Sequence, residues 1–178
     1  MTKADIEAYK RRLGGLRSRA SGQAFESLIE ASCKWYEMRG LLKATKTPEP
    51  MRPLGRPNKK GQFLACYTKK AQVDFSGTMI SGRSVRFEAK QTYSDRFERS
   101  RLTDDQMKDL RGHQDMGAMC FVLLCFGNTH FYRVPWGVWD NMRPIYGRQY
   151  VKEDDLQQYR IPYEGGVIKF MGDEEADV

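Results

Sequence analysis

Asp74, Glu88 and Lys90 are the residues whose types and spacing are best suited to chemistry. Polar and apolar residues alternate at positions 72–76 and 86–90, which predicts two neighbouring strands that each carry one polar face. Side chains two positions apart share a face of a strand, so Glu88 and Lys90 should project side by side. Strands in a sheet lie about 4.8 Å apart, which lets Asp74 reach the same point if the register places it beside Glu88.

This trio has the composition of a metal site. Two carboxylates so close together repel each other unless a cation lies between them, and oxygen ligands favour Mg²⁺ or Mn²⁺ over zinc. The ammonium group of Lys90 would then hold a water beside the metal or stabilise charge on a phosphate. The ordinary alternative is a structural Glu/Lys ion pair, because the Glu-x-Lys pattern occurs by chance in many proteins.

Two helices should pack beside these strands. Apolar residues recur at three- and four-residue spacing from Ser21, a candidate N-cap, until Gly40, which predicts an amphipathic helix. A second helix should begin at Thr103, with Gln106 completing a capping box, and end near residue 116.

The remaining pattern predicts the rest of a sheet. Residues 119–126 are continuously apolar, as in a central strand covered on both faces, and residues 129–134 should add an edge strand. A connection over residues 77–82 should join the two polar strands, and short helical stretches should begin at Pro135 and near Glu153. The order of elements predicts an α/β domain of three layers with a mixed sheet.

Length and composition point to one domain spanning residues 1–178. The chain has 178 residues, of which 40% are hydrophobic. No apolar run approaches the roughly 20 residues of a membrane span, and the first residues lack the apolar core of a signal peptide, so we expect a cytoplasmic protein. Four scattered cysteines without a CxxC pair, and only two histidines, argue against a zinc site.

Charge is unevenly distributed along the chain. Residues 1–70 hold 16 Lys and Arg against 6 Asp and Glu, a balance of +10, whereas residues 71–178 hold 14 against 17, a balance of −3. Clustered cations release counterions from closely spaced phosphates, so DNA is the expected partner. The alternative is a basic protein without such a partner.

Three segments lie outside the predicted core. Residues 1–20, interrupted by Gly14-Gly15, should form a flexible basic arm with at most a short helix, and residues 171–178 an acidic, disordered tail. Four prolines among residues 48–57 should preclude regular structure there, and a strand-like run follows at residues 62–68. The candidate DNA-binding residues are Arg11, Arg12, Arg17, Arg19, Lys59, Lys60, Lys69, Lys70 and Arg83.

The motifs occur in the order of a known family. Asp74 followed by Glu88-Ala89-Lys90 is the arrangement of the PD-(D/E)XK nucleases, and the chain resembles the RecU-type Holliday junction resolvases over residues 22–163. The resemblance is carried by Gly22-Gln23-Ala24-Phe25-Glu26, Gly40, Lys46-Thr47-Pro48, Val73-Asp74-Phe75-Ser76-Gly77, Gly82-Arg83, Phe87-Glu88-Ala89-Lys90-Gln91-Thr92, Gln106 and Cys120-Phe121-Val122. It implies a restriction-endonuclease-like core with a central mixed β-sheet flanked by helices, and the brevity of the chain suggests a phage-encoded member in the cytoplasm of a bacterial host.

The same resemblance implies an activity. A homodimer would make paired, metal-dependent nicks in four-way DNA junctions during recombination, replication and repair, with residues 46–70 as a stalk that enters the junction and a recombinase as a further partner. Two alternatives stay open: a related repair or restriction-like nuclease, and a non-catalytic DNA-binding module of the same fold.

Site residues follow from the resemblance position by position. Asp74 and Glu88 would bind Mg²⁺ or Mn²⁺, and Lys90 would be the catalytic lysine. Gln106 matches the metal-site glutamine of the family. Gln72 stands two residues before Asp74, where the family often has a threonine, and would be a further candidate metal ligand. Glu26 would either join the site through water or remain a solvated helix residue.

Overall fold

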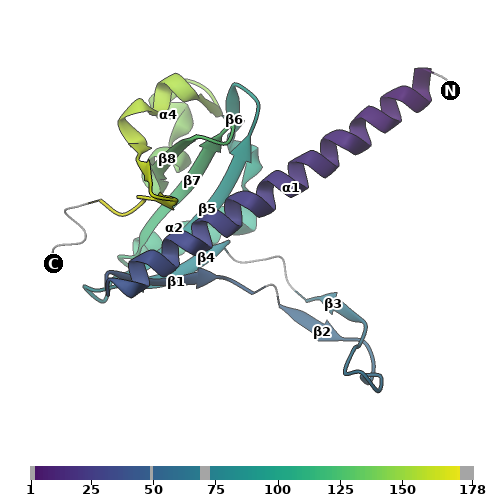
Figure 1. Ribbon diagram of the computed structural model, residues 1–178. Helices are drawn as coiled ribbons and strands as arrows, with labels where there is room; N and C mark the ends of the chain where they lie inside the picture. Colours follow the sequence, from purple (N-terminus) through teal and green to yellow (C-terminus); the bar gives the residue numbers. More distant parts are fainter. Residues whose placement is uncertain (1–2, 49, 69–72, 173–178) are drawn as a thin grey trace.

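The computed structural model describes residues 3–48, 50–68 and 73–172, with side chains from residue 21 onward (Figure 1). Its helices are α1 (Lys3–Met38), α2 (Asp104–Asp115), α3 (Trp136–Asp140) and α4 (Met142–Tyr146), with 3₁₀ helices η1 (Arg99–Arg101) and η2 (Glu153–Tyr159). Its strands are β1 (Leu42–Lys46), β2 (Met51–Pro53), β3 (Ala65–Tyr67), β4 (Phe75–Met79), β5 (Ser84–Thr92), β6 (Arg96–Glu98), β7 (Met119–Phe126), β8 (His130–Pro135), β9 (Tyr150–Lys152), β10 (Arg160–Ile161), β11 (Tyr163–Glu164) and β12 (Val167–Ile168).

One six-stranded sheet forms the centre of the molecule, in the order β1-β4-β5-β7-β8-β10. Strands β5 and β7 are parallel and the other neighbours are antiparallel, so the sheet is mixed. Helix α1 packs on one face, and α2 and α3 pack on the other (Figure 1). The predicted α/β fold class, with helices on both faces of a mixed sheet, is confirmed.

Both faces of the sheet carry a hydrophobic core. On the α1 side the rings of Phe75, Phe87 and Phe121 stack across three adjacent strands, with centroid distances of 5.0 and 4.7 Å. Trp136 and Trp139 are fully buried in the core on the α2 side. Every residue of β7 is buried, which confirms the predicted central strand. Each large side chain removed from water in this way contributes about 1.5–3 kcal/mol.

Helix α1 begins earlier than the sequence predicts. It starts at Lys3 and runs without interruption to Met38, so residues 3–20 are helical and the predicted start at Ser21 is wrong. Extending an existing helix adds one hydrogen bond per residue without a new nucleation cost. The good helix formers of this segment outweigh Gly14 and Gly15, each of which destabilises a helix by about 1 kcal/mol relative to alanine. No helix in the described part of the chain, α1 included, combines the length and apolar character that crossing a bilayer requires.

Predicted boundaries are also wrong at two strands of the sheet. Strand β4 begins at Phe75, so Asp74 lies in a bend just before it and not on the strand predicted over residues 72–76. The strand continues to Met79, although the connection was expected to begin at Gly77. A Cβ atom on Gly77 would lie 2.3 Å from the backbone oxygen of Lys43, so β1 can approach only because this residue is glycine. Strand β8 is not an edge strand, because the two-residue strand β10 pairs beyond it. A strand of two residues leaves no periodic pattern in the sequence.

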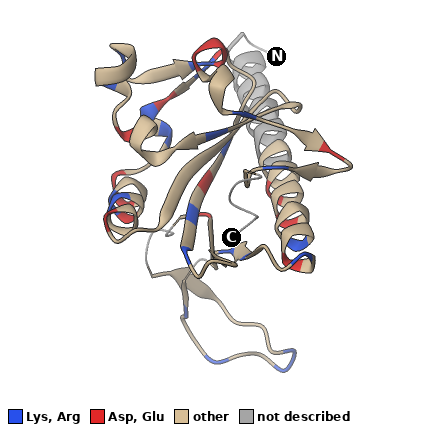
Figure 2. Cartoon of the chain, turned by 90° about the vertical axis from the view of Figure 1, so that its left-hand side faces the viewer, with Lys and Arg blue, Asp and Glu red and all other residues tan. Residues whose placement is uncertain are grey.

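The proline-rich insertion forms a hairpin that projects from the body (Figure 1). Strands β2 and β3 pair antiparallel, with Arg52 opposite Cys66 and Pro53 opposite Ala65, so the expectation that prolines preclude regular structure is wrong. Both strands of an isolated hairpin are edge strands, and proline is tolerated where its missing N–H would face away from the partner strand. The described residues 50–68 contain four Lys and Arg and no carboxylate (Figure 2).

Candidate active site

The register of β4 and β5 brings the two predicted carboxylates together. Phe75 lies opposite Phe87 and Ser76 opposite Arg86. The backbone N–H of Asp74 donates a hydrogen bond to Glu88 Oε1 at 3.2 Å. In turn, the N–H of Ala89 donates to Asp74 Oδ2 at 2.9 Å. These reciprocal bonds hold both carboxylates at one point of the sheet.

Lys90 completes the cluster from the same strand as Glu88. Its Nζ lies 2.6 Å from Glu88 Oε2 and 3.4 Å from Asp74 Oδ2, so one cation contacts both carboxylates. The Glu88 side chain is fully buried, and the side chains of Lys90 and Asp74 are only 18% and 22% exposed. Buried charges at this spacing are stable only while each keeps its partner.

Burial dominates the electrostatics of Glu88. Removal from water, with the charge of Asp74 added, raises the pKa of Glu88 to about 8 even though Lys90 opposes the shift. Burial alone would lower the pKa of Lys90, but the charges of Glu88 and Asp74 outweigh it and the pKa of Lys90 is raised. A divalent cation between the carboxylates would favour the ionised form of Glu88.

We expect the metal-free protein to lose stability as Glu88 titrates. The folded-state pKa of about 8 lies above the ordinary value of 4.5, so the folded protein binds this proton more tightly than the unfolded chain does. The resulting stabilisation is fully present below pH 4.5 and is lost as the pH rises through about 8. Thermal unfolding in EDTA at about pH 5.5, 7 and 8.5 measures this loss.

The variant Glu88→Gln isolates this contribution, because glutamine does not titrate. The difference in free energy of unfolding between wild type and variant should change across this pH range, and Mg²⁺ at the highest pH should raise the Tm of the wild type only. Identical pH dependence of the two proteins would contradict the assignment.

Helix α2 supplies Gln106, which lies directly against Glu88. Its Nε2 donates to Glu88 Oε2 at 2.8 Å, while its Oε1 accepts from the backbone N–H of Thr103 at 3.0 Å. Thr103 caps the helix in the predicted capping box, so the start of α2 also fixes the direction of the Gln106 side chain. In this orientation the amide N–H of Gln106 orients the carboxylate of Glu88. Gln106 would bind a metal through its side-chain oxygen only after its amide group had turned.

Glu26 meets Lys46, and the structure shows no contact between Glu26 and Asp74, Glu88 or Lys90. Lys46, at the end of β1, forms an ion pair with Glu26, and the hydrogen bond to Glu26 raises the pKa of Lys46, with the charge of Asp74 also contributing. The backbone N–H of Thr47 donates to the backbone oxygen of Asp74 at 2.8 Å. Lys46 is therefore a neighbour of the site that the sequence analysis did not assign, although its Lys46-Thr47-Pro48 motif stood in the resemblance.

The sequence of the chain matches a known family over most of its length. The family model of Recombination protein U (RecU) matches residues 20–170, which include Asp74, Glu88, Lys90 and Gln106. The chain belongs to the RecU family. The predicted resemblance is thereby confirmed. None of the curated proteins compared matches the chain. Among solved structures, the Holliday junction resolvase Hjc of Archaeoglobus fulgidus is similar at 13% identity and a TM-score of 0.48, covering 77% of this chain and 93% of that one.

The carboxylate cluster of this RecU-family chain offers oxygen donors of the kind that a hard divalent cation prefers. Asp74 and Glu88 already converge on one cation, the ammonium group of Lys90, and their ligand atoms are oxygens. No group of three or more His, Cys, Asp and Glu side chains among the described residues could hold a metal, so the set is two carboxylates with Gln106 beside them. Its residues therefore fit Mg²⁺ or Mn²⁺ and do not resemble a zinc site.

Three predicted DNA-binding residues of this RecU-family chain have described side chains, and none of the three contacts the carboxylates. Lys59 and Lys60 are exposed in the turn of the projecting hairpin. Arg83 donates to the backbone oxygen of Gly117 at 2.9 Å, and it lies five positions before Glu88, which is about 16 Å along a strand. The structure does not bring Arg83 to the site. Gln72, Lys69 and Lys70 lie outside the described residues, and the side chains of Arg11, Arg12, Arg17 and Arg19 in α1 are not described.

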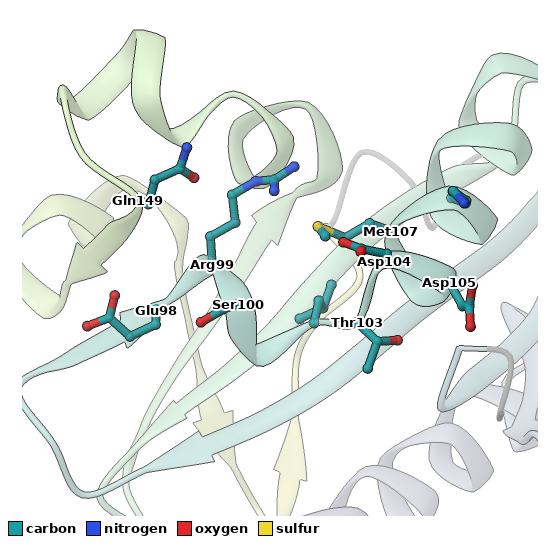
Figure 3. Close-up of a pocket in the computed structure, with 10 residues that line it drawn as sticks. Glu98, Arg99, Ser100, Thr103, Asp104, Asp105, Met107 and Gln149 are labelled. Carbon is teal, nitrogen blue, oxygen red and sulfur yellow. The ribbon is translucent and has the colours of Figure 1, made fainter.

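A pocket of about 710 Å³ adjoins the first turn of α2 in this RecU-family chain (Figure 3). Glu98 and Gln149 lie on one side of it, and Asp104 and Met107 on the other (Figure 3). Its charges are of both signs, and Arg99 is paired with Asp140 at 2.8 Å. The pocket thus offers no concentration of one charge, and the carboxylate cluster remains the candidate active site.

Proposed function

We propose that this chain is a Holliday junction resolvase, a metal-dependent endonuclease that makes paired nicks in four-way DNA junctions. The observation that carries the proposal is the convergence of Asp74, Glu88 and Lys90 in a chain of the RecU family. The basic hairpin and the excess of Lys and Arg in residues 1–70 supply the charge that phosphates require. Two nicks across a junction need two active sites, so the active form we propose is a homodimer.

Each residue of the cluster would have its own role in the hydrolysis of a phosphodiester. Asp74 and Glu88 would hold Mg²⁺ or Mn²⁺, which supplies Lewis acidity to the phosphate and a more acidic bound water. Lys90 stands beside both carboxylates, where its ammonium group stabilises the charge that develops on phosphorus oxygens. Gln106 would orient the carboxylate of Glu88 through its 2.8 Å hydrogen bond. The expected product carries a 5′-phosphate.

Cleavage of three substrates tests the proposal. Four-way junctions, forks and linear duplexes of equal length are incubated with the protein in Mg²⁺, and binding is measured by gel shift in EDTA. Preferred, symmetric nicking of the junction supports a resolvase. Equal cleavage of all three substrates would indicate a related repair or restriction-like nuclease, and binding without cleavage would indicate a non-catalytic DNA-binding module.

Deleting residues 52–66 should weaken junction binding by about tenfold or more while changing duplex binding little. The deleted hairpin carries the four cations, together with Phe63, which is 51% exposed. An open junction has a central cavity lined by phosphates that such a projection can enter, and linear duplex has none. Gel shifts with both DNAs in EDTA measure the two affinities.

A matched variant separates shape from charge in this experiment. Lys59→Gln with Lys60→Gln keeps the hairpin but removes two of its charges, so it should weaken junction binding less than the deletion does, change duplex binding little, and reduce the salt dependence of junction binding. If the deletion weakens junction and duplex equally, the hairpin is only a basic patch and junction selectivity lies elsewhere.

A further inference from the structure

A groove of about 960 Å³ lies between the last turns of α1, strands β8 and β10, and residues 162–172. None of the proposed catalytic residues lines it. Among the described residues that do, three are cations, Arg133, Arg160 and Lys169, and one is a carboxylate, Glu164. The groove is therefore electropositive, in a part of the chain whose sequence balance is negative.

Trp35 lies in the groove between Lys169, which lines the groove, and Arg39, which does not. Lys169 Nζ lies 3.3 Å and Arg39 Cζ 3.7 Å from the centroid of the Trp35 ring. Two cations at these distances must lie over opposite faces of one ring, and the π electrons stabilise both. Arg39, Arg160 and Lys169 form no ion pair with any residue that the structure describes, and Arg133 donates to the backbone oxygen of Phe170 at 3.0 Å. Arg160 and Lys169, two of the cations that line the groove, are therefore not paired with any described carboxylate.

We infer that this groove is an anion-binding site for residues 173–178 of the same chain. Their sequence is Asp-Glu-Glu-Ala-Asp-Val, with four carboxylates in six residues. Gly172, the residue directly before them, lines the groove. Six residues reach at most about 20 Å, so the carboxylates are held at high effective concentration beside Arg133, Arg160 and Lys169.

Docking of this acidic segment would neutralise a basic surface that otherwise attracts DNA without regard to its shape. The segment would thus act as an intramolecular competitor of non-specific phosphate contacts. The inference goes beyond the proposed function, because it needs neither the metal nor cleavage.

Quenching of Trp35 fluorescence by iodide tests the inference. Trp35 is half-buried at the groove, whereas Trp136 and Trp139 are buried in the opposite core and provide a constant background. The full-length quadruple variant Asp173→Asn, Glu174→Gln, Glu175→Gln and Asp177→Asn should be quenched about twofold more strongly than the wild type, because an unmasked positive groove attracts iodide. High salt should abolish the difference.

Two controls make the result specific. Neutralising four exposed carboxylates elsewhere gives the same change in net charge and should leave the quenching as in the wild type; these are Asp95→Asn, Asp105→Asn, Asp115→Asn and Asp154→Asn. Trp35→Phe should remove the difference in iodide quenching between the protein with the wild-type segment and the protein with the neutralised segment.

Equal quenching of the wild type and the segment variant would overturn the inference. A difference that appears only at high protein concentration would also overturn it, because the segment would then come from a second copy. Neither readout depends on DNA cleavage, so failure of the resolvase proposal leaves the outcome unaffected.

Discussion

Asp74→Asn and Glu88→Gln should each reduce junction nicking by about 10³-fold or more while leaving junction binding intact. Each change removes one of the two negative charges that would hold the metal, and each substitute has nearly the same shape. Binding in EDTA should survive in both variants. It should tighten for Asp74→Asn, which removes a negative charge from a partly exposed side chain, and change little for Glu88→Gln, because Glu88 is fully buried. Single-turnover cleavage in Mg²⁺ and gel shifts in EDTA measure the two effects separately.

The variant Asp154→Asn is the matched control for charge. Asp154 is exposed on η2, far along the chain from the carboxylate cluster, and makes no hydrogen bond through its side chain to any described residue. Its cleavage rate should equal that of the wild type. Full activity in either Asp74→Asn or Glu88→Gln, with the folded state verified by circular dichroism, would refute the site assignment.

Lys90→Ala should lower the cleavage rate by about 10²-fold or more with little change in junction affinity. A lysine that stabilises charge developing in the transition state contributes to rate more than to ground-state binding. The change also leaves the buried Glu88 without the cation that now lies 2.6 Å away, so the metal-free variant should have a lower Tm than the wild type.

Lys108→Ala provides the comparison, because Lys108 is an exposed lysine on α2, the helix that carries Gln106. It should keep the wild-type rate. Should Lys90→Ala mainly weaken binding and leave the rate at saturating protein unchanged, Lys90 would be a phosphate clamp and not a catalytic residue.

Local sequence patterns were sufficient to predict the strands that carry the site. Alternation of polar and apolar residues over 72–76 and 86–90 predicted that Asp74, Glu88 and Lys90 lie close together. The structure brings the three together, although Asp74 lies in the bend just before β4 and not on the strand. The capping box at Thr103 and the apolar run of β7 are equally short-range signals and were read correctly. These features depend on residues a few positions apart, so they are visible in one sequence.

Contacts between distant segments were decided only by the tertiary structure. Three such contacts join residues that are 18 to 34 positions apart in the sequence. They are the hydrogen bond from Gln106 to Glu88, the ion pair of Lys46 with Glu26, and the close approach of Gly77 to the backbone of Lys43. The full burial of Glu88, which raises its pKa, likewise depends on what packs over β5 and not on its neighbours in sequence. Nor did local periodicity show that α1 extends back to Lys3 or that β10 pairs beyond β8. Periodicity reports which face of an element is apolar, whereas register and partner follow from the packing of all elements at once.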